Sequence, residues 1–266
     1  MAYLFGPAGW SYKDWEGTVY PAPKPANFNH LQFLGRSFDF MEVNTSFYHI
    51  PSIKLTSGWI KKTESLPDFK FWIKVYQDFT HKRILEKGAI EAFQQALQPL
   101  VDAGKLAGVL AQFPYSFKPN PENLDYLLDL CQAFHDYHPA VEFRHHHWNR
   151  QEVLDTFQEN RITWVNIDQP PISLNLPLTA WQTHPEIAYF RLHGRNTQSW
   201  FSDEGRDARY NYDYNAKELN QIAEFIKKLR ETAKKIFISG NNHYKGNAVQ
   251  NLLALKKILS PSTSLS

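Results

Sequence analysis

Residues 120–144 read NPENLDYLLDLCQAFHDYHPAVEFR, and they contain the pattern that decides the fold. Asn120 suits the N-cap of a helix, and Pro121 suits the first helical position. Apolar residues then recur at helical spacing, which gives a helix over 121–137 one apolar face: Leu124, Leu127, Leu128, Cys131 and Phe134. A short apolar run begins at His138 and is typical of a buried strand. The stretch therefore predicts a helix that leads into a strand.

The same alternation continues along the chain. Strand-like runs begin near eight residues: Leu4, Phe38, Lys70, Leu106, His138, Ile162, Ile187 and Lys235. Segments with helical spacing lie between them: 28–35, 55–65, 90–103, 121–137, 150–160, 216–232 and 246–259. The segment 169–185 differs, because it is rich in proline and has little periodicity. It predicts a loop, so that the sixth crossover helix is weak or missing.

Eight strand starts, one every roughly 33 residues, match the length of a βα unit. Strands that alternate with helices form a parallel sheet with right-handed crossovers, and eight units predict a single (β/α)8 TIM-like barrel. The alternative is an open doubly wound sheet, but the early turn Gly6–Gly9 lacks the G-x-G-x-x-G spacing of a dinucleotide site. No linker interrupts residues 1–259, which we expect to form one domain, and the Ser-rich residues 260–266 are expected to be a frayed tail.

Composition excludes several classes of protein. The 266 residues include 29 Lys and Arg against 27 Asp and Glu, so the charge balance does not indicate a surface dominated by basic residues. Cys131 has no partner for a disulfide, which fits a reducing cytosol. The first residues lack the pattern of a signal peptide, and no apolar stretch approaches the ~20 residues that span a bilayer. We therefore expect a cytoplasmic protein without membrane partners.

Many of the predicted strands carry polar residues two apart near their C-terminal ends. A step of two residues places both side chains on one face of a strand, and in a closed barrel we expect that face to point inward at the mouth. The predicted inner layer holds Glu42, Lys74, Glu142 and Arg191. The layer above it holds Asn44, Tyr76, Gln112, Arg144, Asp168, His193 and Asn241, with Arg195 and Asn242 close by in the loops. Asn166 forms an inward pair with Asp168 in this prediction.

These residue types suggest acid–base chemistry on a charged ligand. Glu142 or Glu42 is the predicted acid or base, while Lys74 and His193 polarise the substrate or relay protons. The predicted ligand-binding residues are Asn44, Gln112, Arg144, Asp168, Arg191, Arg195, Asn241 and Asn242. Because arginine forks suit carboxylate and phosphate, the expected ligand is small and either anionic or sugar-like. The structural alternative is a buried ion-pair network with no catalytic role.

Three consecutive histidines, His145, His146 and His147, resemble a metal site at first sight. In an extended segment their side chains alternate in direction, so at most the first and third could share an ion. A divalent metal among the mouth carboxylates and His193 is opposed by the nearby arginines and Lys74. We predict no metal site and no cofactor.

Ordered motifs over nearly the whole chain resemble those of the YecE-like family, also known as domain of unknown function 72. They are Gly9-Trp-Ser-Tyr12, Met41-Glu-Val-Asn-Thr-Ser-Phe-Tyr48, Thr80-His81, Gln112-Phe-Pro114, Val141-Glu-Phe-Arg-His145, Tyr189-Phe-Arg-Leu-His-Gly-Arg195, Tyr212-x-Tyr214 and Asn241-Asn-His243. The resemblance implies a TIM-like barrel with these motifs around one end, and it implies no particular reaction. His146 and His147 stand where the family usually has Pro-Ser or similar residues.

Three classes of function stay open at this point. The leading hypothesis is an enzyme, a hydrolase or an isomerase, and paired glutamates also permit a glycosidase. The second is a nucleic-acid binding or repair protein, in which loop tryptophans such as Trp10, Trp15, Trp148, Trp181 and Trp200 stack on bases. The third is a non-catalytic ligand-binding or interaction protein built on a barrel.

Overall fold

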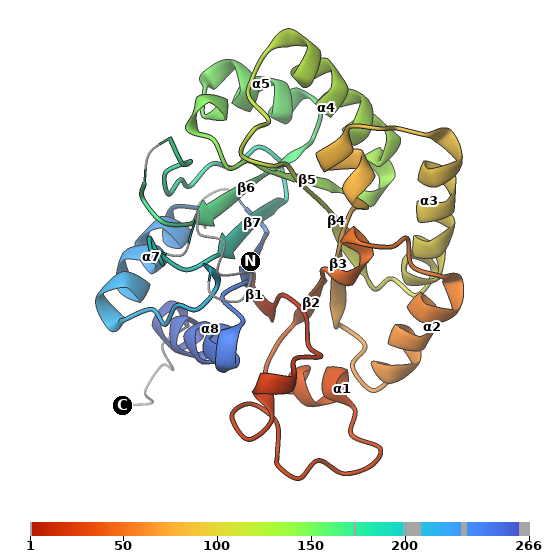
Figure 1. Ribbon diagram of the computed structural model, residues 1–266, viewed down its shortest axis with the longest axis vertical. Coiled ribbons are helices and arrows are strands. Elements are labelled where there is room, and N and C mark those ends of the chain that lie inside the picture. The colour runs from red at the N-terminus through yellow and green to blue at the C-terminus, as the bar shows by residue number, and fades with distance from the viewer. Residues whose placement is uncertain (1, 173, 199, 201–208, 230–232, 261–266) are drawn as a thin grey trace.

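The protein is a barrel of eight parallel strands surrounded by helices (Figure 1). The structure, a computed structural model, describes residues 2–172, 174–198, 200, 209–229 and 233–260. The strands are β1 (Ala2–Pro7), β2 (Phe40–Val43), β3 (Lys70–Lys74), β4 (Leu106–Gln112), β5 (Pro139–Glu142), β6 (Thr163–Asp168), β7 (Ile187–Leu192) and β8 (Lys235–Gly240). They follow the order β1-β8-β7-β6-β5-β4-β3-β2, which confirms the predicted fold. The predicted frayed tail lies, apart from Ser260, outside the described residues.

Helices cover the outside of the barrel. They are α1 (His30–Leu34), α2 (Ile53–Lys62), α3 (Lys87–Asp102), α4 (Pro121–Ala133), α5 (Gln151–Glu159), α7 (Ala216–Leu229) and α8 (Asn247–Leu259). Short helical turns follow several strands, at Lys13–Trp15, Thr45–Phe47, Asp78–Lys82, His135–Tyr137, His146–Trp148 and Tyr244–Gly246. At α4 the predicted cap is confirmed, because the Asn120 side chain accepts a hydrogen bond of 2.7 Å from the Asn123 backbone N–H. None of the described helices is long and apolar enough to cross a membrane.

Between β6 and β7 the described residues form a loop instead of a helix, as the prolines predict. The side chain of Asn166 on β6 anchors this loop. Its Nδ2 donates to the Trp181 carbonyl at 2.9 Å, and its Oδ1 accepts from the Trp181 N–H and the Thr179 hydroxyl, both at 2.8 Å. One amide side chain therefore pairs with the loop backbone in the way that a neighbouring strand would.

The barrel closes between β1 and β2 through few backbone contacts. Ala8 and Glu42 form an isolated parallel bridge there, and the Gly9 N–H donates to the Glu42 carbonyl at 2.8 Å. Nearer the N-terminal ends of the two strands, the Asp39 N–H donates to the Phe5 carbonyl at 2.8 Å. We call this junction the β1–β2 seam.

Large aromatic side chains fill the barrel below its mouth. Trp72 stacks on Tyr189 with ring centroids 4.5 Å apart, and Phe40 and Phe237 contact the pair edge to face. Glycine makes room for them: a Cβ at Gly108 would lie 2.3 Å from the Trp72 ring. This apolar plug means that the barrel interior below the mouth is a packed core and not a pore.

A candidate active site at the barrel mouth

Three charged side chains form the floor of the mouth. Arg191 on β7 binds Glu42 on β2 with two hydrogen bonds, from Nε to Oε2 at 2.8 Å and from Nη2 to Oε1 at 2.5 Å. Its Nη1 donates to Oε2 of Glu142 on β5. All three residues are at most 1% exposed, so one guanidinium joins two fully buried carboxylates.

Glu42 is saturated with hydrogen bonds. In addition to Arg191, its Oε2 accepts from the Tyr189 hydroxyl at 2.6 Å and from the Ser239 hydroxyl at 2.9 Å. Burial alone would raise the pKa of Glu42, but the charge and hydrogen bonds of Arg191, with the two hydroxyls, lower it. These contacts favour the ionised form of Glu42, which supports the structural alternative for this residue.

Glu142 connects the floor to the upper layer. Its Oε1 lies 2.7 Å from Arg144 Nη2 and 3.2 Å from His193 Nε2. Burial opposes ionisation of Glu142, but the charges of Arg144 and Arg191 hold its pKa well below the usual range. Burial and the charge of Arg144 lower the pKa of His193 to about 3, so His193 is neutral. Its Nδ1 lies 3.0 Å from Asn241 Nδ2, whereas its Nε2 is near Glu142 Oε1 without forming a hydrogen bond to it.

Lys74 at the end of β3 is different from these paired groups. Its Nζ donates to Gln112 Oε1 at 2.8 Å and lies 4.2 Å from the centroid of the Phe47 ring. Within the described ranges, no carboxylate forms an ion pair with it. Burial, followed by the charge of Arg191, lowers the pKa of Lys74 to about 7. The side chain is partly exposed, so this amine can meet a ligand.

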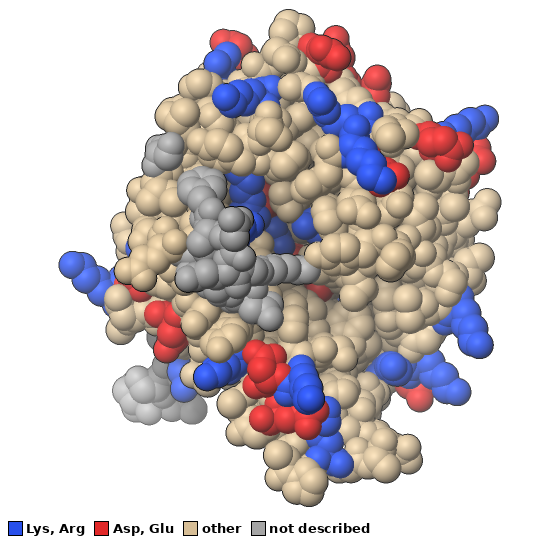
Figure 2. Space-filling view, in the orientation of Figure 1, with Lys and Arg blue, Asp and Glu red and all other residues tan. Residues whose placement is uncertain are grey.

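A cavity of about 310 Å³ opens above these groups and is lined by His81, Gln112, Pro114, Tyr115, Arg144, Trp200, Arg209 and Tyr210. Figure 2 shows Lys and Arg side chains inside the hollow at the centre of this face. Arg209 Nε is buried and has no hydrogen-bond partner among the described residues. The His81 ring contacts the Phe47 ring edge to face, and Lys74 Nζ lies over the same Phe47 ring. Loss of hydration and the charge of Lys74 lower the pKa of His81 to about 4.

The predicted inward orientation of Asp168 and Asn166 is wrong. In the β6–β7 ladder, Ile167 is the partner of Arg191 and Asp168 is the partner of Leu192, so Ile167 faces the interior and Asp168 faces out. Asp168 accepts from Arg195 Nη2 at 2.7 Å and from the Tyr214 hydroxyl at 2.6 Å.

Arg195 and Asn242 also belong to the outer packing. Arg195 binds Asp168 and contacts α7, where its Nη1 lies 3.2 Å from Gln221 Oε1. Asn242 is fully buried, and its Nδ2 donates to the Tyr212 carbonyl at 2.9 Å and to Asn251 Oδ1 at 2.8 Å. The structure thus separates these residues from the mouth.

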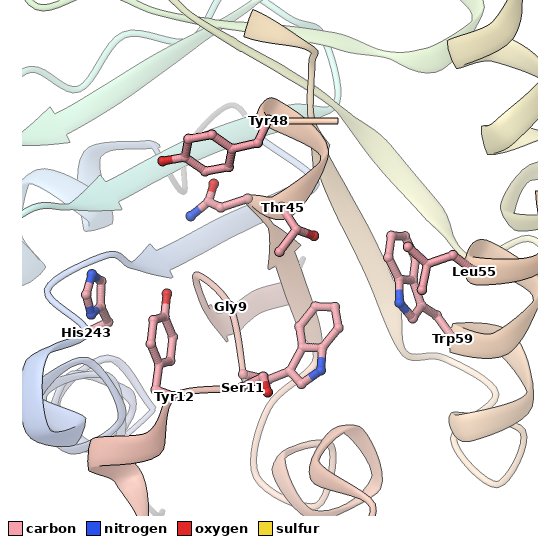
Figure 3. Close-up of a pocket in the computed structure, with 10 residues that line it drawn as sticks. Gly9, Ser11, Tyr12, Thr45, Tyr48, Leu55, Trp59 and His243 are labelled. Carbon is pink, nitrogen blue, oxygen red and sulfur yellow. The ribbon is translucent and has the colours of Figure 1, made fainter. Parts of the chain in front are cut away.

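A second cavity, of about 440 Å³, lies beside the Thr45–Phe47 turn and contains Asn44 in its lining. Figure 3 shows Tyr12 next to His243 on one side of this cavity and Trp59 on the other. The rings of Tyr12 and His243 stack at 4.5 Å, and Trp10 contacts Trp59 edge to face. Among the described residues that line this cavity there is no Lys, Arg, Asp or Glu, so they do not offer the charged groups of the barrel mouth.

The three histidines are closer together than an extended segment would allow, because His146 begins a 3-10 turn. Candidate ligand atoms of His145, His146 and His147 all lie within 4.8 Å of one another. However, His145 Nδ1 accepts a hydrogen bond of 3.2 Å from the His147 N–H, which leaves the proton on Nε2. A metal at that Nε2 would have to displace this proton. The absence of a metal site stays a prediction.

Sequence reasoning missed several residues of the mouth cavity. His81 was visible only as part of a family motif, and Tyr115, Arg209 and Tyr210 lie in loops where no period marks them. Trp200 was noted only as a loop tryptophan, and its ring lies 5.6 Å from the Arg144 guanidinium carbon.

The fold and the site define a (β/α)8 barrel protein with a mouth of mixed charge. The chain belongs to the DUF72 family, "Protein of unknown function DUF72", whose family model matches residues 4–265. It is 32% identical over 270 residues to the UPF0759 protein YunF of Bacillus subtilis, covering 94% of this chain and 92% of YunF.

Crystal structures of other members share the architecture. The DUF72 family protein TM1631 of Thermotoga maritima matches with a TM-score of 0.86 and 34% identity, covering 98% of this chain and 100% of that one. The DUF72 family protein EF0366 of Enterococcus faecalis matches with a TM-score of 0.85 and 27% identity, covering 98% of this chain and 96% of that one.

Proposed function

We propose that this protein is an enzyme that binds a small anionic metabolite at the barrel mouth and uses Lys74 as its acid–base group. The observation that carries the proposal is an excess of positive charge beside the cavity. Within the buried network, Glu42 and Glu142 balance Arg191 and Arg144. Arg209 at the cavity, and Lys74 when protonated, are then left to meet a ligand.

Position and size favour a small ligand. The cavity of about 310 Å³ lies at the C-terminal ends of the strands, where barrel enzymes carry out their chemistry. Arg144 and Arg209 offer planar donors that suit carboxylate or phosphate, and Gln112 and Tyr210 offer hydrogen bonds to neighbouring hydroxyls. Sugar acids and sugar phosphates combine these features.

Lys74 supports catalysis better than the glutamates do. Both glutamates bind the same guanidinium and are fully buried, which argues against a glycosidase pair and against Glu42 as a base. An amine whose pKa is about 7 can accept or release a proton at neutral pH, as proton transfer in an isomerase requires. We place the enzyme in the cytoplasm, because its single cysteine has no disulfide partner in the chain and its first residues lack the pattern of a signal peptide. We propose no cofactor.

Anion binding tests this proposal. We expect inorganic phosphate, followed by isothermal titration calorimetry, to bind the wild-type protein and to bind Arg209→Met at least ~10-fold more weakly, since one charged hydrogen bond contributes about 1.5–3 kcal/mol. Arg195→Met is the matched control, because Arg195 faces away from the mouth. Equal affinity in all three proteins, or no binding, would contradict the proposal. Anion binding without turnover in a screen of sugar phosphates and oxo acids would favour the non-catalytic alternative.

A further inference from the structure

We infer that Lys74 is a nucleophile that forms a Schiff base with its substrate, so that the substrate is a small anion with an aldehyde or ketone group, such as a 2-oxo acid or an oxo phosphate. The inference rests on the proposed function and adds the identity of the reacting group. Three features support it: the surroundings of the Lys74 amine, the neighbouring cations and the position of His81.

The surroundings of the amine are those of a nucleophile and not of a structural cation. Among the described residues Lys74 Nζ forms no ion pair with a carboxylate: it donates to the neutral Gln112 carbonyl oxygen and lies over the face of Phe47. Lys105 shows the contrast: it donates to the carbonyls of Thr63 and Leu66 at 3.2 Å and 2.7 Å. Both acceptors of Lys105 are backbone carbonyls, so its amine is held in a fixed position and is not available to a ligand.

Burial and neighbouring cations together favour the neutral form of the amine. Burial lowers the pKa of Lys74 most, and the charges of Arg191 and Arg144 lower it further, against the opposite effects of Glu142 and Glu42. Burial beside other cations is the usual way in which enzymes activate a lysine for attack on a carbonyl group. The same arginines attract the anionic part of a substrate, so a single arrangement both activates the amine and selects its target.

The covalent step balances without an oxidant or a reductant. The lone pair of the neutral Nζ attacks the carbonyl carbon, the C=O π electrons move to oxygen, and a proton passes from nitrogen to that oxygen. The carbinolamine hydroxyl then takes a second proton and leaves as water, which gives the C=N⁺ iminium ion. Addition of water reverses these steps and returns Lys74.

His81 is placed to move these protons. It lines the cavity, its ring lies 4.8 Å from that of Phe47, and its Nδ1 lies 3.0 Å from the Thr80 hydroxyl. His193 is a poorer relay, since it is fully buried and its Nδ1 is bonded to Asn241 Nδ2. We assign His81 the role of a positioning residue for proton transfer.

Reductive trapping tests the inference. The wild-type protein is incubated with glyoxylate and sodium cyanoborohydride at pH 7, and a peptide map compares Lys74 with the exposed Lys54 and Lys61 in the same digest. A lysine with a pKa of about 7 is half neutral at this pH, whereas fewer than ~1 in 1,000 ordinary lysines are neutral. We expect Lys74 to carry the carboxymethyl group at least ~100-fold faster than the two controls. Labelling of Lys74 at their rate would overturn the inference.

Two further arms separate this inference from the proposed function. Acetaldehyde replaces glyoxylate as a neutral probe, and inorganic phosphate is added as a competitor. If both proposals hold, glyoxylate labels Lys74 faster than acetaldehyde does, and phosphate slows it. Equal fast labelling by both probes, without protection, would support the Schiff base and contradict the anion site. Phosphate binding without selective labelling of Lys74 would support the anion site and contradict the Schiff base.

A positioning role of His81 has its own readout. His81→Gln is expected to slow the labelling of Lys74 at least ~10-fold while leaving the pH midpoint near that of the wild-type protein. Lys74→Arg keeps a positive charge and must lose the label at this position. A variant His81→Gln that labels at the wild-type rate would remove His81 from the step.

Discussion

Arg191 on β7 and Glu42 on β2 are joined by two parallel hydrogen bonds of 2.8 Å and 2.5 Å, although β8 and β1 separate their strands on the side of the barrel that contains the β1–β2 seam. The pair therefore crosses the β1–β2 seam, where the described strands share only an isolated bridge and a few backbone hydrogen bonds. Tyr189 and Ser239 bind the same Glu42 oxygen from the far side of the seam. The network thus closes the barrel as well as shaping the floor of the mouth.

Removal of Arg191 should destabilise the protein strongly. We expect Arg191→Met to lower the free energy of unfolding by about 3–5 kcal/mol, because Glu42 and Glu142 would both lose their buried partner. Urea denaturation followed by circular dichroism measures this change. The double variant Glu42→Gln with Arg191→Met should recover part of the loss, since one unpaired charge is gone. A double variant no more stable than Arg191→Met would argue against the pairing.

His193 should make stability depend on pH. Because burial lowers its pKa to about 3 from an ordinary value near 6.5, the unfolded chain binds a proton that the folded protein does not. The stability from neutral His193 is fully present above about pH 6.5 and is lost as the pH falls toward 3. His193→Gln should therefore have a slope shallower by up to ~1.4 kcal/mol per pH unit between pH 6 and 4, measured by urea denaturation. His49→Gln, at an exposed position, is the matched control for the same substitution.

A pair of glycines tests the packing of the barrel interior. A Cβ at Gly6 on β1 would lie 2.2 Å from the Phe40 carbonyl oxygen, whereas one at Gly58 within α2 meets nothing within 4 Å. Gly6→Ala should lower the free energy of unfolding by at least about 1–3 kcal/mol through overpacking. Gly58→Ala should raise it by about 0.5–1 kcal/mol, because alanine is the better helix former. Thermal or urea denaturation compares the two, and equal effects would contradict the structure.

The outward position of Asp168 predicts that it supports the fold but not the chemistry. Asp168→Asn should lower the free energy of unfolding by about 2 kcal/mol by weakening its bonds to Arg195 and Tyr214. It should leave the rate and pH midpoint of Lys74 labelling unchanged. Glu142→Gln is the contrast, because loss of this negative charge should move that midpoint below the wild-type value. A changed midpoint in Asp168→Asn would place Asp168 at the mouth after all.

Local patterns in the sequence were sufficient to predict the fold. Helical spacing and the Asn120 cap located α4, and the prolines of 169–185 located the missing helix. The inward faces of β2, β5 and β7 also followed, since Glu42, Glu142 and Arg191 recur at the strand ends.

β6 could not be predicted from the alternation of polar and apolar residues alone. Asn166 and Asp168 suggested a polar inner face, but the described residues between β6 and β7 form no helix, and those polar groups bind the loop and Arg195, while Ile167 faces in. The partition of the mouth into paired and unpaired charges also depends on distances between different strands. Our proposal that Lys74, and not Glu42, is the reactive group depends on this partition, and local spacing carries no information on it.

The anchoring of the loop by Asn166 has a consequence for dynamics. Its backbone lacks the repeated bonds of a helix and depends on tertiary bonds that converge on one side chain. Residues near Thr179 and Trp181 should therefore open together as one cooperative unit, at a free energy below that of global unfolding. Amide hydrogen exchange would detect this sub-global opening as faster exchange at Trp181 than in the strands that it covers. The barrel would then contain one segment whose backbone hydrogen exchange is controlled by the side-chain amide of Asn166.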